Sequence, residues 1–341
     1  MKLSFSLVPE ATDLPGYVET IRQAEADGFD LVWTPDQGFM ADPFIALGLA
    51  GAATTRAQLG LGITSVFMRH PIQIARAAGT LANLTGGRFV LGLGAGEKAR
   101  IRDRIGAPGG GFVPMTAAAI DALRALFAGE TVTARTEAFA LDGVGLEFAV
   151  RHPVPIHVAT TAPEAFRMSG ARADGVIVGD VSDPAIMERI VGWIREGATA
   201  AGRPADAVEV IAWTGTILTD DPAPIREAMR RPVAGTALVG MHSETRRLFG
   251  VDPEHVPLIK AARRDPSAPL PPDAIPDETI DRLALIGTPE QLAARIGALA
   301  EVGVTMMGFR MPVALRRHVD FAANVRALAR EVRPRLTSAR P

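Results

Sequence analysis

The chain changes repeatedly between short apolar runs and segments with helical spacing, and this alternation limits its fold more than any other feature. The runs of strand length are residues 2–9, 30–35, 58–67, 88–95, 154–160, 174–180, 207–220 and 304–312. The segments with helical spacing are 16–28, 43–55, 71–85, 114–129, 163–173, 184–202, 289–303 and 315–332. Strands that alternate with helices predict an α/β fold with a parallel sheet. Eight such units fit a (β/α)8 TIM barrel better than an open, doubly wound sheet.

Two inserted segments interrupt the alternation. Residues 131–148 are typical of a small hairpin, with Asp142 and Gly143 as its turn. A Pro-rich helical stretch runs from about 221 to 280. We expect a single TIM-barrel domain over residues 1–341, with a hairpin near 130–150 and a helical insertion near 221–280. In the alternative, an open sheet, the second segment would be a domain of its own.

The composition indicates a small molecule as the partner. The 341 residues carry a formal net charge of -2, so no global field attracts nucleic acid or a membrane surface. No window approaches 18 uninterrupted apolar residues, so we expect no membrane span and a cytoplasmic protein. The chain has no cysteine, and its six histidines form no close cluster, so no metal site is expected.

In a TIM barrel, the residues that directly follow the strands form the active face. Several of these residues are polar or glycine here, although a turn between a strand and a helix accepts many residue types. The segments are Ser6–Glu10, Pro35–Gln37, Thr64–Arg69, Gly94–Glu97, Ala159–Thr161, Gly179–Asp180, Thr214–Thr219 and Arg310–Pro312.

One of these turns belongs to the glycine-rich stretch GGRFVLGLGAGEKAR at residues 86–100. Its spacing, G-x-G-x-G, differs from that of dinucleotide-binding loops, and no helix opens directly after it. Three interpretations stay open: a phosphate loop, a turn that needs positive φ, or glycines that let a planar ring lie against the backbone. In the third, Glu97 stands at the barrel mouth. It is either functional or an ion-pair partner of Lys98 or Arg100.

Two further turns carry groups that can contact a ligand. In TSVFMRHP, Arg69 and His70 precede Pro71, which is expected to begin a helix. They either face an anionic or carbonyl-bearing ligand or act locally, with the histidine as a cap. In WTPDQGF, Asp36 and Gln37 either hydrogen-bond a ligand or form a turn.

The stretch HVATTAPEA ends a strand with Thr160 and Thr161, just before Pro163. Their hydroxyls and the N-terminus of the following helix are suited to a phosphate. Equally, Thr161 is a good N-cap for a helix that begins at Pro163.

Four segments combine these features: AEADGFDLVWTPDQ, LGLGITSVFMRHPIQIARAAGTLANLTGGRFVLGLGAGE, VPIHVATTAPEAFRMSGARADGVIVG and IPDETIDRLALIGTPEQLAARIGALAEVGV. In order and spacing they resemble the bacterial luciferase-like flavin and deazaflavin oxidoreductases over nearly the whole chain. The run from Gly60 to Glu97 is the specific part. Its RHP and GGRFVLGLGAGE, joined with IPDE and GTPEQ, look most like the coenzyme F420-dependent branch, and within it like the methylenetetrahydromethanopterin reductases.

The resemblance implies a TIM barrel with a deazaflavin at the carboxyl ends of the strands. It also implies a non-prolyl cis peptide bond at Gly62–Ile63, behind the ring, and Glu97 near the reactive edge. The turn at residues 159–161 would lie near the cofactor's side chain and phosphate. The cofactor-binding residues that follow from the resemblance are Gly62, Ile63, Thr64, Gly94, Ala95, Gly96, Glu97, Ala159, Thr160, Thr161, Gly179 and Asp180.

The sequence departs from the family pattern at three places. Gln37 stands where many relatives have histidine, which argues against a sugar-phosphate dehydrogenase. Ser6 stands where methylene-pterin reductases have glutamate, which argues against that specific reaction. Thr161 and Ala162 replace a glycine that usually follows the small residues of the fifth barrel strand, so the phosphate contacts would differ.

These features predict an F420-dependent oxidoreductase that moves a hydride between C5 of the deazaflavin and a small organic substrate. The predicted catalytic residues are Glu97, Gln37 and Asp36, and the predicted substrate residues are Ser6, Arg69, His70 and Arg310. An FMN-dependent monooxygenase or reductase on the same barrel is the first alternative, and a non-catalytic cofactor-binding homologue is the second. By resemblance, a homodimer is expected. The apolar helix at 43–55 either forms an interface or packs on the barrel.

Overall fold

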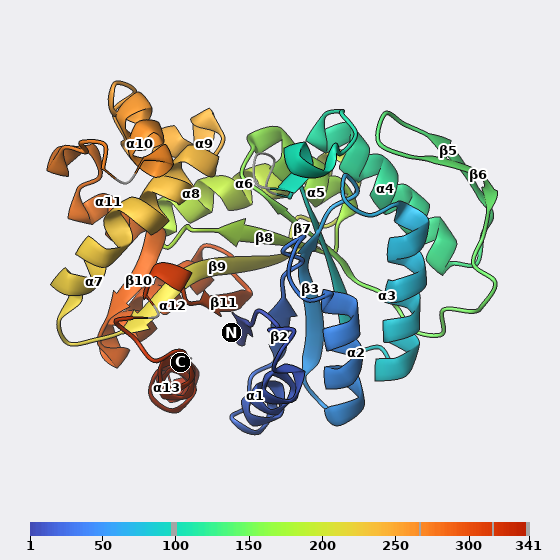
Figure 1. Ribbon diagram of the computed structural model, residues 1–341, viewed down its shortest axis with the longest axis horizontal. Helices are drawn as coiled ribbons and strands as arrows, with labels where there is room; N and C mark the ends of the chain where they lie inside the picture. The colour runs from blue at the N-terminus through green and yellow to red at the C-terminus, as the bar shows by residue number, and fades with distance from the viewer. Residues whose placement is uncertain (97–100, 266, 316, 339–341) are drawn as a thin grey trace.

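The computed structural model describes residues 1–96, 101–265, 267–315 and 317–338, which form a ring of parallel strands enclosed by helices (Figure 1). Around the ring the order is β1-β2-β3-β4-β7-β8-β9-β11, and β11 pairs with β1 to close it. The strands are β1 (Lys2–Ser6), β2 (Leu31–Thr34), β3 (Gln58–Thr64), β4 (Phe89–Gly94), β7 (Ile156–Thr160), β8 (Gly175–Gly179), β9 (Glu209–Leu218) and β11 (Met306–Arg310). The predicted TIM barrel is confirmed.

The helices that return the chain between strands begin in a common way. Most have proline in the first turn, preceded by a side chain that accepts a backbone N–H of that turn; examples are Asp42, Asp183 and Thr288. These helices are α1 (Leu14–Ala26), α2 (Pro43–Ala53), α3 (Pro71–Thr85), α4 (Phe112–Phe127), α5 (Pro163–Arg172), α6 (Pro184–Ala200), α12 (Pro289–Glu301) and α13 (Phe321–Ala327). None of the helices in the described ranges is both long and apolar enough to cross a bilayer.

Two indole rings fill the inside of the barrel. Trp33 and Trp213 stack with 5.5 Å between their ring centroids and an interplanar angle of 29°. The facing strand β3 has glycine at both contacts. A Cβ at Gly60 would lie 2.3 Å from Trp33, and one at Gly62 would lie 2.5 Å from Trp213. These glycines are therefore required by the packing of the barrel interior.

The segment after β9 adds helices and a ninth strand outside the ring. It contains α7 (Pro222–Met229), α8 (Gly235–Gly240), α9 (Ser243–Leu248), α10 (His255–Arg264) and α11 (Asp277–Leu283). Figure 1 shows these helices grouped on one side of the barrel, away from the hairpin of β5 (Val132–Arg135) and β6 (Ala140–Val144) on the other. Strand β10 (Ala284–Gly287) pairs with the second half of β9. The sequence did not predict β10, because four apolar residues directly between two helices carry no strand periodicity.

The hairpin consists of β5 (Val132–Arg135) and β6 (Ala140–Val144), but its turn is not the predicted one. The chain reverses between Thr136 and Phe139, where the N–H of Thr136 donates to the carbonyl oxygen of Phe139 at 2.9 Å. The Thr136 hydroxyl also accepts the Phe139 N–H at 2.9 Å. Gly143 instead lies within β6 at φ +61°, where the pairing register shifts. The threonine side chain replaces the Asp-Gly turn that we expected.

The predicted terminal helix at 315–332 begins later and is not continuous. A single 3-10 turn ends at Leu315, and α13 starts only after Asp320, which accepts the N–H of Ala323 at 3.0 Å. A π-helical turn (Leu328–Val332) separates α13 from α14 (Arg333–Ser338). The N-cap at Asp320 explains the later start.

Candidate functional site

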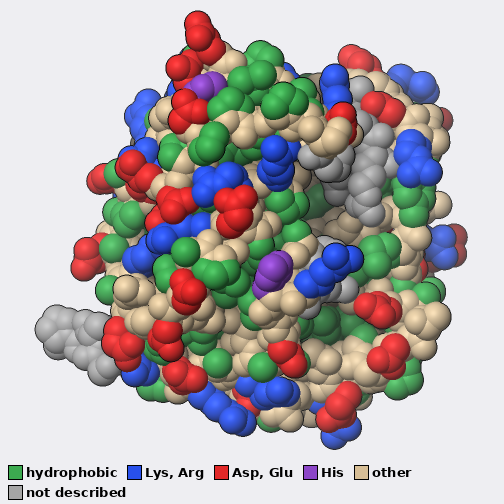
Figure 2. Space-filling view, turned by 60° about the vertical axis from the view of Figure 1, so that its left-hand side comes forward, with side chains coloured by type: hydrophobic (Ala, Val, Ile, Leu, Met, Phe, Trp, Pro, Cys, Tyr) green, Lys and Arg blue, Asp and Glu red, His purple; other side chains and the backbone are tan. Residues whose placement is uncertain are grey.

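A cavity of about 1520 Å³ lies at the carboxyl ends of the barrel strands. All eight strands of the ring contribute residues to it, mostly near or just beyond their carboxyl ends, whereas β9 contributes Trp213 from its middle. Single ligand pockets commonly measure about 300–1,000 Å³, so this cavity has room for a large cofactor together with a second molecule. Acidic and basic side chains are interspersed over the face of the molecule in Figure 2. No broad field of one sign therefore covers this side.

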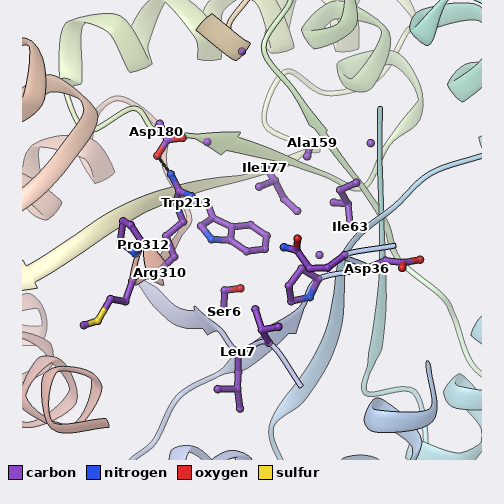
Figure 3. Close-up of a pocket in the computed structure, with 18 of the residues that line it drawn as sticks. Ser6, Leu7, Asp36, Ile63, Ala159, Ile177, Asp180, Trp213, Arg310 and Pro312 are labelled. Atoms are coloured by element: carbon purple, nitrogen blue, oxygen red, sulfur yellow. Dashed lines mark hydrogen bonds and ion pairs between the residues drawn. The ribbon is translucent and has the colours of Figure 1, made fainter. Parts of the chain in front are cut away.

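The indole of Trp213 forms the floor of the cavity. Figure 3 shows it in the middle of the site, between Ser6 on one side and Ile177 on the other. Only 9% of Trp213 is exposed, and its Nε1 has no hydrogen-bond partner in the described part of the chain. By contrast, Trp33 Nε1 donates to Ser4 Oγ at 3.1 Å. A buried donor without a partner is uncommon in folded proteins, and this one borders the cavity.

One wall of the cavity is an irregular part of β3. The pairing of β3 with β4 shifts between Leu61 and Thr64, and the Gly62–Ile63 peptide bond is cis, as the resemblance implied. The side chain of Ile63 consequently fills the space beside β4. A Cβ at Gly94 would lie 2.7 Å from Ile63 Cδ1, and one at Gly92 would lie 2.2 Å from the Leu61 oxygen. These two glycines of the GLGAG stretch are therefore needed by the chain's own backbone and by Ile63.

The third glycine of that stretch, Gly96, lines the cavity directly. Its φ is +68°, a conformation that glycine adopts without steric cost. This matches the interpretation of the stretch as a turn that requires positive φ. Glu97, Lys98 and Arg100 lie outside the described residues.

The turn after β7 joins the cavity to the inserted helices. Thr160 Oγ1 accepts the Ala162 N–H at 3.3 Å, and within the described chain no side chain caps α5. Thr161 is not the N-cap that the sequence suggested. Its hydroxyl accepts the His242 N–H at 3.2 Å, and its carbonyl accepts the Thr245 hydroxyl at 2.6 Å. Thr161 thus holds the segment around α9 against the cavity, which leaves the first turn of α5 without a side-chain partner.

Asp36 lines the cavity, but its carboxylate is directed away from it (Figure 3). The Asp36 side chain is 4% exposed and accepts Arg69 Nε at 2.7 Å. Arg69 also donates to Asp42 at 2.8 Å. Burial lowers the pKa of Arg69, but the hydrogen bonds and charges of Asp36 and Asp42 outweigh it and raise that pKa overall.

His70 caps α3 and contacts the hairpin. Its Nδ1 accepts the Ile72 N–H at 3.3 Å, so its Nε2 carries the proton and donates to Ala140 O at 3.1 Å. The ring also lies edge-on to Phe139, with 6.1 Å between centroids. The structure thus gives His70 the local role that the sequence left open.

Arg310 and Asp180 form an ion pair across one end of the cavity (Figure 3). Asp180 has φ +55°, which is uncommon for a residue with a side chain, and its N–H donates to Trp213 O at 3.0 Å. The two side chains are partly buried, at 33% and 20% exposure. They place a guanidinium and a carboxylate side by side at the rim beside the floor, without net charge.

Most of the predicted site residues meet at this cavity. Those that line it are Ser6, Asp36, Gln37, Gly62, Ile63, Gly94, Ala95, Gly96, Ala159, Thr160, Thr161, Gly179, Asp180 and Arg310. Thr64, Arg69 and His70 are not among the lining residues. Thr64 is fully buried, and its hydroxyl donates to Asp36 at 2.8 Å.

The sequence missed several residues of the site. Trp213 belonged to a predicted strand, and its inward direction could have been found from strand alternation. Tyr17 comes from α1; it shares a 2.6 Å hydrogen bond with Thr34, and burial raises the pKa of its hydroxyl. Met241 and His242 come from the inserted segment. No local pattern marks these last three, because tertiary packing alone brings them to the cavity.

Residues 3–306 match the family described as luciferase-like monooxygenase. The chain belongs to this luciferase-like family. The match covers most of the chain, including the inserted segment and the cavity residues up to Trp213, Met241 and His242, but not the lining residues from Arg310 onward. The resemblance seen in the sequence is thereby confirmed.

Similar proteins include enzymes that are named for different substrates. A 5,10-methylenetetrahydromethanopterin reductase of Methanolobus tindarius is 30% identical over 291 residues, 85% of this chain and 88% of that protein. An F420-dependent hydroxymycolic acid dehydrogenase of Mycobacterium tuberculosis is 30% identical over 220 residues, 60% of this chain and 59% of that protein. The solved coenzyme F420-dependent tetrahydromethanopterin reductase from Methanopyrus kandleri has a TM-score of 0.82 and 24% identity, and covers 98% of this chain and 99% of its own. This last likeness shows the fold.

Proposed function

We propose that this chain is a coenzyme F420-dependent oxidoreductase that transfers a hydride between C5 of the deazaflavin and a small organic substrate. The observation that carries the proposal is the wall of the cavity at β3 and β4, where glycine and alanine residues line the cavity beside Ile63. The F420-dependent enzymes among the relatives support the choice of cofactor. The reductase from Methanolobus tindarius supports the reaction class.

The residues present fit a deazaflavin. Gly62, Ile63 and Ala95 would face the ring, and the unpartnered Nε1 of Trp213 adds a buried donor on the floor. The uncapped first turn of α5, beside Thr160, would receive the phosphate, because free backbone N–H groups at a helix start favour anions. The cofactor supplies the hydride chemistry, and the protein supplies binding, orientation and exclusion of water.

Glu97 is our proposed catalytic residue, as a proton-handling group at the reacting edge. It directly follows Gly96, which lines the cavity. Gln37 lines the cavity from the turn after β2 and is the second candidate for contact with the reacting atoms. Asp36 is different, because its carboxylate is committed to Thr64 and Arg69. We therefore assign no proton transfer to Asp36.

The substrate would occupy the part of the cavity between the turns after β1 and β11. Ser6 and Arg310 are the polar groups that we propose for its recognition. The surrounding lining is mixed: Leu7, Val8, Met311, Pro312, Val319 and Phe321 are apolar, and Glu10, Asp13, Arg317, His318 and Asp320 are charged or polar. A substrate with an apolar body and one polar or anionic group fits this lining.

Titration of the purified protein with F420 and, separately, with FMN tests the proposal. We expect F420 to bind in the micromolar range, with a change in its absorbance and fluorescence. Ala95→Leu enlarges a residue of the cavity wall and should weaken F420 binding by about tenfold or more, roughly 1.4 kcal/mol. Ala138→Leu makes the same change in the hairpin turn, away from the cavity, and should leave binding as it is.

The outcomes separate the alternatives. Micromolar binding of FMN without a response to F420 would replace the proposal by a flavin-dependent enzyme. Weak binding of both would favour a homologue without chemistry. Once a substrate is known, unchanged turnover in Glu97→Gln would remove Glu97 from the mechanism.

The assembly that we propose is a homodimer through α2 and α3. Ile45, Leu49 and Leu84 are large apolar side chains that are exposed on these helices, at 65%, 47% and 52%. Exposed apolar side chains gathered on neighbouring helices are typical of protein interfaces. A monomeric mass in size-exclusion chromatography with light scattering would contradict the dimer.

A further inference from the structure

A chain of polar contacts joins the turn after β2 to the wall at β3. Oδ2 of Asp36 accepts the Thr64 hydroxyl at 2.8 Å and Arg69 Nε at 2.7 Å. The backbone N–H of Asp36 donates to Ile63 O at 3.3 Å. Arg69 Nη2 continues the chain by donating to Asp42 Oδ2 at 2.8 Å. One arginine thereby connects both carboxylates with the irregular part of β3.

The geometry of the guanidinium is what allows this bridge. It contacts the two carboxylates through two different nitrogens, and its carbon lies 5.2 Å from the centre of the Phe44 ring. The other oxygen of Asp42, Oδ1, is already used to cap α2, where it accepts the Phe44 N–H at 2.9 Å. A lysine at position 69 presents one compact charge and cannot reproduce two directed contacts at once.

These contacts end at residues that line the cavity. Ile63 is the neighbour of Thr64, and Gln37 is the neighbour of Asp36; both Ile63 and Gln37 line the cavity. Arg69 and Thr64 lie behind that wall and are not lining residues. The network therefore acts on the cavity from behind, by fixing where the lining residues stand.

We propose that Arg69 is a positioning residue: by bridging Asp36 and Asp42 it fixes the places of Ile63 and Gln37 in the cavity wall, and thus how tightly a planar ring binds there. The inference rests on the proposed function, since it takes the ring on this wall to be the deazaflavin. Arg69 itself touches neither cofactor nor substrate. Its substitution changes the site only through the wall.

The test compares Arg69→Lys with a matched change, Arg88→Lys. Arg88 is also a bridging arginine: it donates to Ala57 O at 2.8 Å and Thr54 O at 2.9 Å, between the end of α2 and the start of β4. That end of the barrel is opposite the cavity. Both variants should lower the Tm. Only Arg69→Lys should weaken F420 binding, by about tenfold, and shift the visible absorption band of the cofactor at saturation.

Asp42→Asn provides a graded version of the same change. Asparagine keeps an oxygen that caps α2 as well as aspartate does, but it loses the charged contact to Arg69. We expect a smaller loss of F420 affinity than in Arg69→Lys, in the same direction. We expect Asp42→Asn to fold even if Arg69→Lys does not, because the Asp42 side chain is 35% exposed.

A second measurement does not depend on the cofactor. Hydrogen exchange followed by mass spectrometry should show faster exchange in the peptide that contains residues 62–66 in Arg69→Lys, and no change there in Arg88→Lys. If the unmodified protein fails to bind F420, the proposed function is wrong and hydrogen exchange alone decides the role of Arg69. Equal losses of affinity in both lysine variants, or wild-type binding, absorption and exchange in Arg69→Lys, would overturn the inference.

Discussion

His157 gives the chain a pH-dependent stability that one substitution can isolate. The imidazole lies inside the barrel near the amino ends of the strands, is 2% exposed, and has its ring centroid 5.7 Å from that of Trp33. Burial lowers the pKa of His157 from 6.5 to about 4, although the nearby Glu209 carboxylate favours the charged ring. The folded protein therefore keeps this ring neutral at pH values where the unfolded chain binds a proton.

The sign and size of the effect follow from these two pKa values. Between pH 6.5 and about 4 the unfolded chain binds more protons at this position, so the free energy of unfolding falls as the pH falls. The contribution is complete above 6.5, and no more is lost below about 4. The difference of about 2.5, at about 1.36 kcal/mol for each pKa unit, gives about 3.4 kcal/mol in all. About 2 kcal/mol of this is lost between about pH 7 and about pH 5.

Urea unfolding at pH 7 and pH 5 measures this loss directly. The wild-type protein should exceed His157→Gln in stability at pH 7, and this advantage should shrink by about 2 kcal/mol at pH 5. His318→Gln is the control, because the His318 side chain is exposed. Because this side chain is exposed, the substitution should change stability by no more than about 0.5 kcal/mol. An advantage over His157→Gln that does not change with pH would show that burial does not hold the ring neutral.

Two further changes test the packing of β4 and the cap of α6. Gly92→Ala brings its Cβ to 2.2 Å from the Leu61 backbone oxygen and should destabilise by about 1–3 kcal/mol or more, whereas Gly94→Ala meets the flexible end of Ile63 at 2.7 Å. In thermal denaturation, adding Ile63→Ala should therefore raise the Tm of Gly94→Ala but not that of Gly92→Ala. An equal rise in both would refute this explanation. Asp183→Ala removes the side chain that accepts two backbone N–H groups at the start of α6, and urea unfolding should show a cost of about 1 kcal/mol that Asp183→Asn avoids.

The fold was predictable because its information is local. Most barrel helices have apolar residues at helical spacing after a capping side chain, and α3 runs from Pro71 to Thr85 as its spacing predicted. The parts that failed depend on distant partners. Strand β10 forms through its pairing with the second half of β9, and the hairpin turns at Thr136 through a side-chain contact that competes with the Asp-Gly signal. Periodicity cannot report either contact.

The site was predictable to the extent that the backbone forms it. Gly62, Gly96 and Thr160 line the cavity because they lie at or near the carboxyl ends of strands of one barrel, and strand ends can be read from the sequence. The direction of a long side chain at a strand end cannot be read in this way. Arg69 was expected to face a ligand, but its partner Asp36 lies 33 positions away in the chain and turns it behind the wall.

The glycines of β3 and β4 are required by one connected set of packing contacts. Two indoles inside an eight-stranded barrel require Gly60 and Gly62 on the facing strand, because a Cβ at either position would overlap a ring. The same strand then shifts its register, and Ile63 takes the space beside β4, which requires Gly94 there. The glycine pattern that resembles a cofactor loop is thus set largely by side chains of the barrel itself. We therefore expect ligand specificity to depend on the side chains that line this wall, on Gln37 and the residues of the rim, and on how Arg69 positions the wall.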